Sequence, residues 1–356
     1  MSDGTPIYVD GCFVAHWESD REIVQAMRAG GLAAANCNRV TWEGFSETMT
    51  LLAKYKAWIE ENDDLLRPIY ASEDIVAAAD EGRVGIIIGF QNASPLDDRL
   101  YHLRLFQELG LRVLQLTYST ATSVGGGCWE SRDTPLTDFG RDLVTEANRN
   151  GILIDLSHCS SATAADAIAA SSQPVAFTHV CPAALQPHPR NRTDAEIRAV
   201  AERGGVIGVT FERTYLRAGL AATVDDYLEA IEHVIQVAGE EHVGIGTDFT
   251  LGIADTVEYV ARDKGYGRYY IPGWDSDAYV SSTTATVPAP DGLTNLATQR
   301  EDLVRAMERR GWGDERIRGV LGLNWIRVFS EVWRFGDRLM SARALSPSTG
   351  KSGGDG

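Results

Sequence analysis

The chain has 356 residues, 44% of them hydrophobic, and 33 lysines and arginines against 50 aspartates and glutamates give a net charge of -17. A field of this sign repels phosphate backbones and anionic lipid surfaces, so we expect neither nucleic acid nor a membrane as a partner. The amino terminus lacks the basic and apolar regions of a signal peptide, and no stretch reaches the roughly 18 apolar residues of a membrane span. We therefore expect a cytoplasmic protein.

The cysteines are scattered and have no CxxC spacing, which argues against both a disulfide framework and a thiolate zinc knuckle. We expect reduced thiols at all five positions, which are Cys12, Cys37, Cys128, Cys159 and Cys181.

Short runs rich in β-branched residues, separated by longer segments of helical periodicity, predict buried parallel strands that alternate with helices. The predicted strands lie at residues 7–10, 31–36, 84–90, 111–117, 152–156, 174–178, 205–210 and 242–247. The predicted helices lie at residues 20–29, 46–61, 72–81, 98–109, 138–150, 160–170, 193–203 and 224–238. Eight such units favour a closed (β/α)₈ TIM barrel over an open doubly wound sheet.

The segment 250–294 breaks this alternation, and its tyrosines, glycines and prolines predict a long loop over the barrel mouth. Further helices are expected at 295–310, 314–321 and 324–340, which complete a single domain over residues 1–340. The tail 341–356 is rich in Ser, Gly and Pro and is expected to be disordered.

Polar side chains follow nearly every predicted strand, where enzymes of this fold carry their reacting groups. In chain order these residues are Asp10 and Cys12, Asn36 and Cys37, Gln91 and Asn92, Tyr118, His158, His179, Glu212 and Asp248. The opposite strand ends show no such pattern. This asymmetry predicts an enzyme.

His158 and His179 follow neighbouring strands, so both imidazoles are expected within reach of one zinc ion. Each histidine taken alone is also consistent with a hydrogen-bonded structural role. Asp248 is the candidate general base toward a metal-bound water, the alternative being a carboxylate that caps a loop. We expect structural or solvated roles for His16, His102, His233 and His242, although His16 also has a possible role as a metal ligand.

The loop between residues 188 and 194 carries two guanidinium groups close to the predicted barrel mouth. Because arginine pairs bidentately with carboxylates, Arg190 is a candidate anchor for a substrate carboxylate. The alternative is a surface ion pair with one of the many acidic side chains.

Over about residues 7–335 the chain resembles the renal (membrane) dipeptidases, peptidase family M19, which are binuclear zinc (β/α)₈ hydrolases and commonly homodimers. Its distinctive segments are Val9-Asp-Gly11, Asp155-Leu-Ser-His158, Phe177-Thr-His179, His188-Pro-Arg-Asn191, Gly244-Ile-Gly-Thr-Asp-Phe249 and Leu321-Gly-Leu-Asn-Trp-Ile-Arg-Val328. The resemblance implies metal ligation by His158 and His179, acid/base catalysis by Asp248 and carboxylate binding by Arg190. It also implies a homodimer.

The chain departs from the family where that family binds its first metal. Cys12 and Val14 replace a His and an Asp, and Gln91 replaces a bridging Glu. Tyr118 replaces the histidine that polarises the substrate, and it retains a hydrogen-bond donor for an oxyanion. Cys12 and Gln91 are thus candidate metal ligands, and Asn92 and Tyr118 candidate substrate contacts.

Two dications would be poorly neutralised by the anions that remain, Asp248 and a Cys12 thiolate, so we expect one Zn²⁺ rather than two. A metal-free site is the other alternative. His16 and Glu18, in an H-x-E spacing downstream, are candidate replacements for the lost first-metal ligands.

The sequence therefore predicts a metal-dependent hydrolase of a dipeptide-like or other small amide, in which a metal-activated water attacks the carbonyl carbon. Two alternatives stay open. One is a lyase- or decarboxylase-type enzyme on the same barrel, and the other is an inactive barrel that serves as a binding or scaffold protein.

Overall fold

The computed structural model describes residues 5–15, 21–250 and 289–345. Eight parallel strands form a closed barrel, because the first pairs with both the second and the last, and Asp10 lies opposite Ile245 at the closing seam. These strands are β1 (Tyr8–Val14), β2 (Leu32–Val40), β4 (Val84–Phe90), β5 (Leu111–Gln115), β6 (Leu153–Asp155), β7 (Val175–Val180), β8 (Val206–Val209) and β9 (Val243–Ile245). The predicted (β/α)₈ barrel is confirmed.

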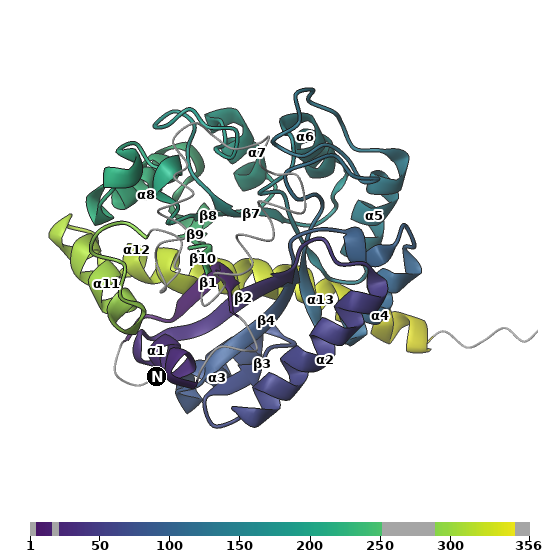
Figure 1. Ribbon diagram of the computed structural model, residues 1–356, viewed down its shortest axis with the longest axis horizontal. Coiled ribbons are helices and arrows are strands. Elements are labelled where there is room, and N and C mark those ends of the chain that lie inside the picture. Colours follow the sequence, from purple (N-terminus) through teal and green to yellow (C-terminus); the bar gives the residue numbers. More distant parts are fainter. Residues whose placement is uncertain (1–4, 16–20, 251–288, 346–356) are drawn as a thin grey trace, which may run out of the picture.

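Helices surround the barrel and pack apolar side chains onto its outer face (Figure 1). They are α1 (Arg21–Ala29), α2 (Phe45–Glu61), α3 (Ser72–Glu81), α4 (Tyr101–Glu108), α5 (Asp138–Arg149), α6 (Ser161–Ala170), α7 (Asp194–Glu202), α8 (Val224–Ala238), α11 (Gln299–Arg309), α12 (Asp314–Arg318) and α13 (Asn324–Leu345). The bounds of α3 and α8 match the prediction. The helix α4 begins later than predicted, because Asp97 and Asp98 adopt left-handed φ angles of 46° and 56° that no α-helix accepts.

The sequence did not predict two short strands. β3 (Leu66–Pro68) pairs with the first half of β4 outside the barrel, and β10 (Phe249–Thr250) extends the sheet beside β1. Runs of two or three residues are too short to show a period of two. The predicted ends of the first two strands were also wrong, because β1 continues to Val14 and β2 to Val40. Polar residues taken as strand ends therefore lie within strands.

The last helix closes the amino-terminal end of the barrel. In Figure 1 α13 (yellow) runs across the barrel strands, and its side chains Trp325, Val328 and Phe329 join the inner core formed by residues such as Val9 and Val206. A π-helical turn, Gly319–Leu323, precedes α13 and replaces the end of the helix predicted over 314–321. The helix α13 also continues to Leu345, past the predicted start of the tail at residue 341.

Several predictions lie outside the described residues. They concern most of the mouth loop (251–288), the pair His16 and Glu18, and the tail 346–356. Among the residues that are described, no helix has the length and apolar character needed to cross a membrane.

Candidate metal centre and active site

Three potential metal ligands converge at the carboxyl end of the barrel. Cys12 in β1, His179 in β7 and Asp248, between β9 and β10, each present a ligand atom, and these atoms all lie within 4.8 Å of one another. Cys12 Sγ is 3.4 Å from Asp248 Oδ1, and Asp248 N donates to Cys12 O at 2.8 Å. Residues far apart in the chain meet here because the parallel strands of a barrel end at one face.

His158 joins this group through His179. The two Nε2 atoms are 2.9 Å apart, which brings together the pair predicted from the sequence. The outer ring nitrogens contact hydroxyl groups, with His158 Nδ1 2.8 Å from Ser119 Oγ and His179 Nδ1 2.7 Å from Thr178 Oγ1. Both imidazoles are thus held from behind with their Nε2 atoms turned toward each other.

The hydrogen bonds around Thr178 determine where His179 carries its proton. The Thr178 hydroxyl donates to Asp155 Oδ2 at 2.7 Å, so its oxygen accepts a hydrogen bond from His179 Nδ1–H. The Nε2 lone pair of His179 therefore faces His158 and the site. Only a proton on His158 Nε2 or a bound cation makes the 2.9 Å approach of the two Nε2 atoms favourable.

A second proton on this pair is disfavoured. Burial lowers the pKa of both imidazoles well below its usual range, and the nearby Arg190 guanidinium lowers both further. Metal ions bind to neutral imidazoles whose unprotonated nitrogen atoms are turned toward the same point. The geometry of His158 and His179 thus fits a divalent ion.

Cys12 is fully buried, and two amide groups point at its sulfur. Asn38 Nδ2 lies 3.4 Å and Gln91 Nε2 3.6 Å from Sγ. Burial and the Asp248 carboxylate raise the pKa of the thiol, so this site favours a thiol unless a cation is bound, whereas the amide donors favour a thiolate. A set of sulfur, imidazole and carboxylate ligands suits Zn²⁺. Gln91 presents its amide nitrogen, not its oxygen, to Cys12.

Two buried carboxylates brace the strand ends around these ligands. Asp10 accepts hydrogen bonds from Thr247 N at 2.9 Å and Cys12 N at 3.1 Å, which ties β1 to the end of β9. Asp155 does the same for β6 and β7, because it accepts from Ser157 Oγ at 2.6 Å and Thr178 N at 3.0 Å. Burial raises the pKa of Asp10 to about 7. Both carboxylates hold ligand-bearing backbone in place.

Asp248 occupies a strained backbone conformation at the centre of the site. Its φ of 57° is left-handed, which is unfavourable for a residue with a side chain and is often found at functional positions. Burial raises the pKa of its carboxyl group to about 6, although Arg190 and the Cys12 hydrogen bond lower it. A carboxyl group with this pKa is ionised at neutral pH and able to exchange a proton with a reacting group.

Arg190 is buried beside the imidazoles. Its Nη1 donates to Ser157 O and its Nη2 to His179 O at 3.2 Å, whereas its buried Nε has no hydrogen-bond partner among the described residues. The surface ion pair considered from the sequence is wrong for Arg190, which is 1% exposed. Its neighbour Arg192 donates to Ser157 O at 2.9 Å and Cys159 O at 2.7 Å, and so holds the loop that carries His158.

The remaining predicted site residues lie around this centre. Tyr118 stacks on the His158 ring at a centroid distance of 4.2 Å and meets Trp42 edge-on at 5.2 Å. Asn92 is buried, and its Oδ1 accepts from Ala93 N at 2.8 Å. Tyr118 is therefore held against a predicted metal ligand, and Asn92 is held by the backbone at the end of β4.

Glu212 is a polar strand end for which the sequence predicts no specific role. It follows β8, is 4% exposed and interacts electrostatically with Asp248. Burial raises the pKa of its carboxyl group to about 7. Its place after a barrel strand was the signal that identified it, and its burial became visible only in the folded chain.

The other described histidines have structural partners, as predicted. His102 Nδ1 contacts Leu96 O at 3.0 Å, His242 Nδ1 contacts Gly205 O at 2.8 Å, and His233 Nε2 contacts Asp194 Oδ1 at 2.8 Å. The five cysteines are free thiols, as expected.

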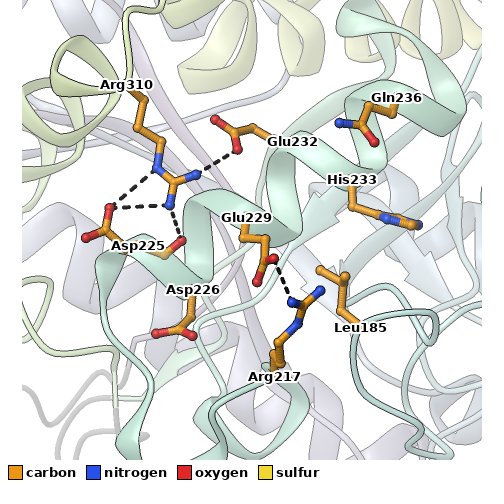
Figure 2. A pocket seen from close by; sticks show the side chains of 9 residues that line it. All are labelled: Leu185, Arg217, Asp225, Asp226, Glu229, Glu232, His233, Gln236 and Arg310. Atoms are coloured by element: carbon orange, nitrogen blue, oxygen red, sulfur yellow. Dashed lines mark hydrogen bonds and ion pairs between the residues drawn. The ribbon is translucent and has the colours of Figure 1, made fainter.

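A polar hollow of about 490 Å³ lies on the outer side of α8, away from the ligand cluster. Figure 2 shows that most of its charged groups pair with one another, since Arg310 contacts Asp225 and Glu232, and Arg217 contacts Glu229 at 3.0 Å. Asp226 accepts from Thr223 N at 2.9 Å and His233 contacts Asp194, so these groups also have partners within the chain, and the barrel mouth is the better candidate for an active site.

Comparison with known proteins agrees with this geometry. The family description "Membrane dipeptidase (Peptidase family M19)" matches residues 21–264. The chain belongs to the membrane dipeptidase family. It is 30% identical over 303 residues to an uncharacterized dipeptidase of Schizosaccharomyces pombe, covering 83% of this chain and 62% of that protein. It is also 30% identical over 285 residues to dipeptidase 3 of Rattus norvegicus, covering 76% and 51%. The chain thus spans about half to three fifths of these relatives.

Solved structures of the same fold support the assignment. An amidohydrolase from Pseudomonas aeruginosa superimposes with a TM-score of 0.84 at 38% identity, covering 93% of this chain and 98% of that one. A metallo peptidase from Rhodobacter sphaeroides, liganded with a phosphinate mimic of the dipeptide L-Ala-D-Ala, gives a TM-score of 0.74 at 22% identity over 92% and 100%. The second comparison concerns the fold alone.

Proposed function

We propose that this protein is a metal-dependent hydrolase that cleaves an amide bond in a dipeptide-like small molecule with one Zn²⁺ per chain. The observation that carries the proposal is the convergence of Cys12, His179 and Asp248 within 4.8 Å, with His158 Nε2 2.9 Å from His179 Nε2. Membership of the membrane dipeptidase family supports the same chemistry.

Cys12, His179 and His158 would hold the metal, and Asp248 lies beside them. A bound divalent ion polarises a carbonyl group and lowers the pKa of water toward neutrality. One ion is favoured over two because Gln91 brings no charge and turns its amide nitrogen toward Cys12, 3.6 Å away. Few anions therefore remain to neutralise a second dication.

Asp248 is the proposed proton carrier. With a pKa near 6 it is ionised at neutral pH, accepts a proton from the attacking water and returns it to the leaving nitrogen. The positive charge of Arg190 limits the rise in the pKa of the Asp248 carboxyl group. Asp248 can therefore act first as a base and then as an acid.

The other residues orient the substrate. Tyr118, held against His158, donates a hydrogen bond to the oxyanion that forms at the carbonyl carbon. Arg190 offers a substrate carboxylate its charge and its Nε hydrogen, which has no partner among the described residues. Asn92 lies at the end of β4 and contributes its amide nitrogen. The homodimer and the cytoplasmic location stay predictions.

Metal content and turnover measured together test this proposal. We expect about one zinc ion per chain by mass spectrometry, and hydrolysis of dipeptides such as L-Ala-D-Ala that is lost on chelation and restored by zinc. His179→Ala should abolish both. His233→Ala is the matched control, because that imidazole bonds to Asp194 on the helix surface and should leave both unchanged. Hydrolysis that survives chelation, or a chain that binds no zinc and cleaves nothing, would refute the proposal.

A further inference from the structure

Glu212 is a buried acidic residue at the barrel mouth that the proposed chemistry leaves without a task. It directly follows Phe211 at the end of β8, where Phe211 N donates to Thr247 O at 3.1 Å and Glu212 N to Thr210 Oγ1 at 3.3 Å. The next residue after Thr247 is Asp248. Glu212 and Asp248 therefore leave two neighbouring strands at the same edge, and their carboxylates repel each other.

Only one oxygen of Glu212 is used by the fold. Oε1 accepts hydrogen bonds from Thr214 N at 3.2 Å and Thr214 Oγ1 at 2.9 Å, which fixes the side chain over a short turn, Arg213–Tyr215. Oε2 accepts no hydrogen bond from any described residue. The carboxylate is thus oriented at one oxygen and open at the other.

Among the described residues no cation donates a hydrogen bond to Glu212, although the charge of Arg213 lowers the pKa of its carboxyl group. The adjacent Arg213 donates instead to Ala289 O at 2.6 Å, Leu220 O at 3.1 Å and Asp291 Oδ1 at 2.8 Å. Arg190 donates to backbone carbonyls such as His179 O, and its guanidinium lies over the Tyr215 ring at 5.7 Å. The phenol of Tyr215 interacts electrostatically with both Arg190 and Glu212.

Burying a carboxylate without a counter-ion costs several kcal/mol, so a residue kept only to cap a turn would be expected to be neutral. A serine, threonine or asparagine at position 212 would cap the Thr214 amide without that cost. An ammonium group that reaches the barrel mouth would pair with the open Oε2 atom and favour the ionised form of this carboxyl group.

We propose that Glu212 determines substrate specificity by binding an ammonium group of the substrate through Oε2. This inference rests on the proposed hydrolase function and narrows its substrates to small amides that carry a primary amine. Arg190 and Glu212, which both interact electrostatically with Tyr215, then present a positive and a negative group to one dipolar molecule. Both an α-ammonium and a side-chain ammonium could pair with Oε2, and substrates that carry one or the other distinguish them.

Two pairs of substrates test the role of Glu212: alanyl-alanine with its desamino analogue propionyl-alanine, and 6-aminohexanoyl-alanine, whose ammonium lies further along the chain, with its desamino analogue hexanoyl-alanine. In the zinc-loaded enzyme we expect kcat/KM for an aminated substrate to exceed that for its own desamino analogue. Glu212→Gln keeps the acceptor for Thr214 but removes the charge, and should reduce this preference by about 10- to 100-fold. The aminated substrate with the larger preference identifies the position of the ammonium.

Glu229→Gln is the matched control. It removes the same charge from the chain, but Glu229 lies on α8 and pairs with Arg217 (Figure 2), so the preference should not change. Circular dichroism and zinc content establish that each variant is folded and loaded. An equal loss on all four substrates in Glu212→Gln, or an unchanged preference within both pairs, would overturn the proposal.

Binding separates this inference from the hydrolase proposal. Calorimetry with a phosphinate dipeptide mimic and its desamino form measures recognition without turnover. If the wild-type protein cleaves none of the substrates but prefers the aminated mimic only when Glu212 is present, hydrolysis is refuted and ammonium recognition stands. If it cleaves dipeptides and Glu212→Gln does not alter either preference, the hydrolase stands and the role of Glu212 is refuted.

Discussion

Replacing Trp325 by alanine should both destabilise the barrel and weaken metal binding. The Trp325 side chain is fully buried, stacks on Phe329 at 5.5 Å and donates from Nε1 to Ile245 O at 2.9 Å. Its ring fills the space beside Gly11 and Gly244, where an added Cβ would lie 2.2 Å and 2.4 Å from ring atoms. The indole therefore supports the strand segment that carries Cys12 from below.

The expected magnitude follows from these contacts. Truncating a buried tryptophan to alanine costs about 3–5 kcal/mol, and the lost hydrogen bond adds about 1 kcal/mol. We expect the free energy of unfolding, measured by urea titration, to fall by about 4–6 kcal/mol. Trp325→Phe should lose only about 1–2 kcal/mol, because it keeps the stacked ring.

Trp58→Ala provides the matched control. Trp58 is also buried, on α2 outside the barrel, and its Nε1 has no hydrogen-bond partner among the described residues. It should lose about 3–5 kcal/mol without a change in zinc affinity, whereas Trp325→Ala should lose affinity as well. A loss below about 2 kcal/mol in Trp325→Ala, or equal zinc affinities in the two variants, would refute this account of the barrel floor.

Three further outcomes are expected. Gln91→Glu supplies a carboxylate beside Cys12 and should raise the zinc content from about one toward two ions per chain by mass spectrometry; an unchanged content would argue against the charge reasoning. Because the pKa of Asp248 is raised to about 6, kcat should fall as the pH drops through 6, and Asp248→Asn should lose about 10²- to 10⁴-fold in kcat without that pH step. Folding raises the pKa of Glu212 to about 7, so the protonated side chain stabilises the folded state at low pH, and this stabilisation is lost as the pH rises from about 4.5 to 7. In urea titrations Glu212→Gln should therefore be more stable than the wild type at pH 8 but not at pH 4.

The sequence predicted the barrel correctly because its evidence is local. A β-branched run such as Val84–Phe90 and an amphipathic segment such as Val224–Ala238 each reveal their own structure, and eight alternations leave few topologies. The short strand Leu66–Pro68 was missed because three residues carry no periodicity. The predicted end of the strand near Cys12 was wrong. A buried polar residue inside a barrel strand looks the same in the sequence as a polar residue just after the strand.

The order of residues in the chain was enough to predict that polar groups gather at the carboxyl ends of a (β/α)₈ barrel and that His158 and His179 lie together. The folded chain was needed to show that Cys12 and Asp248 meet His179 and that the carboxyl group of Glu212 is buried. The physical reason is that strand order follows from the chain, whereas the distance between two side chains depends on strand register, backbone conformation and the hydrogen bonds behind each group.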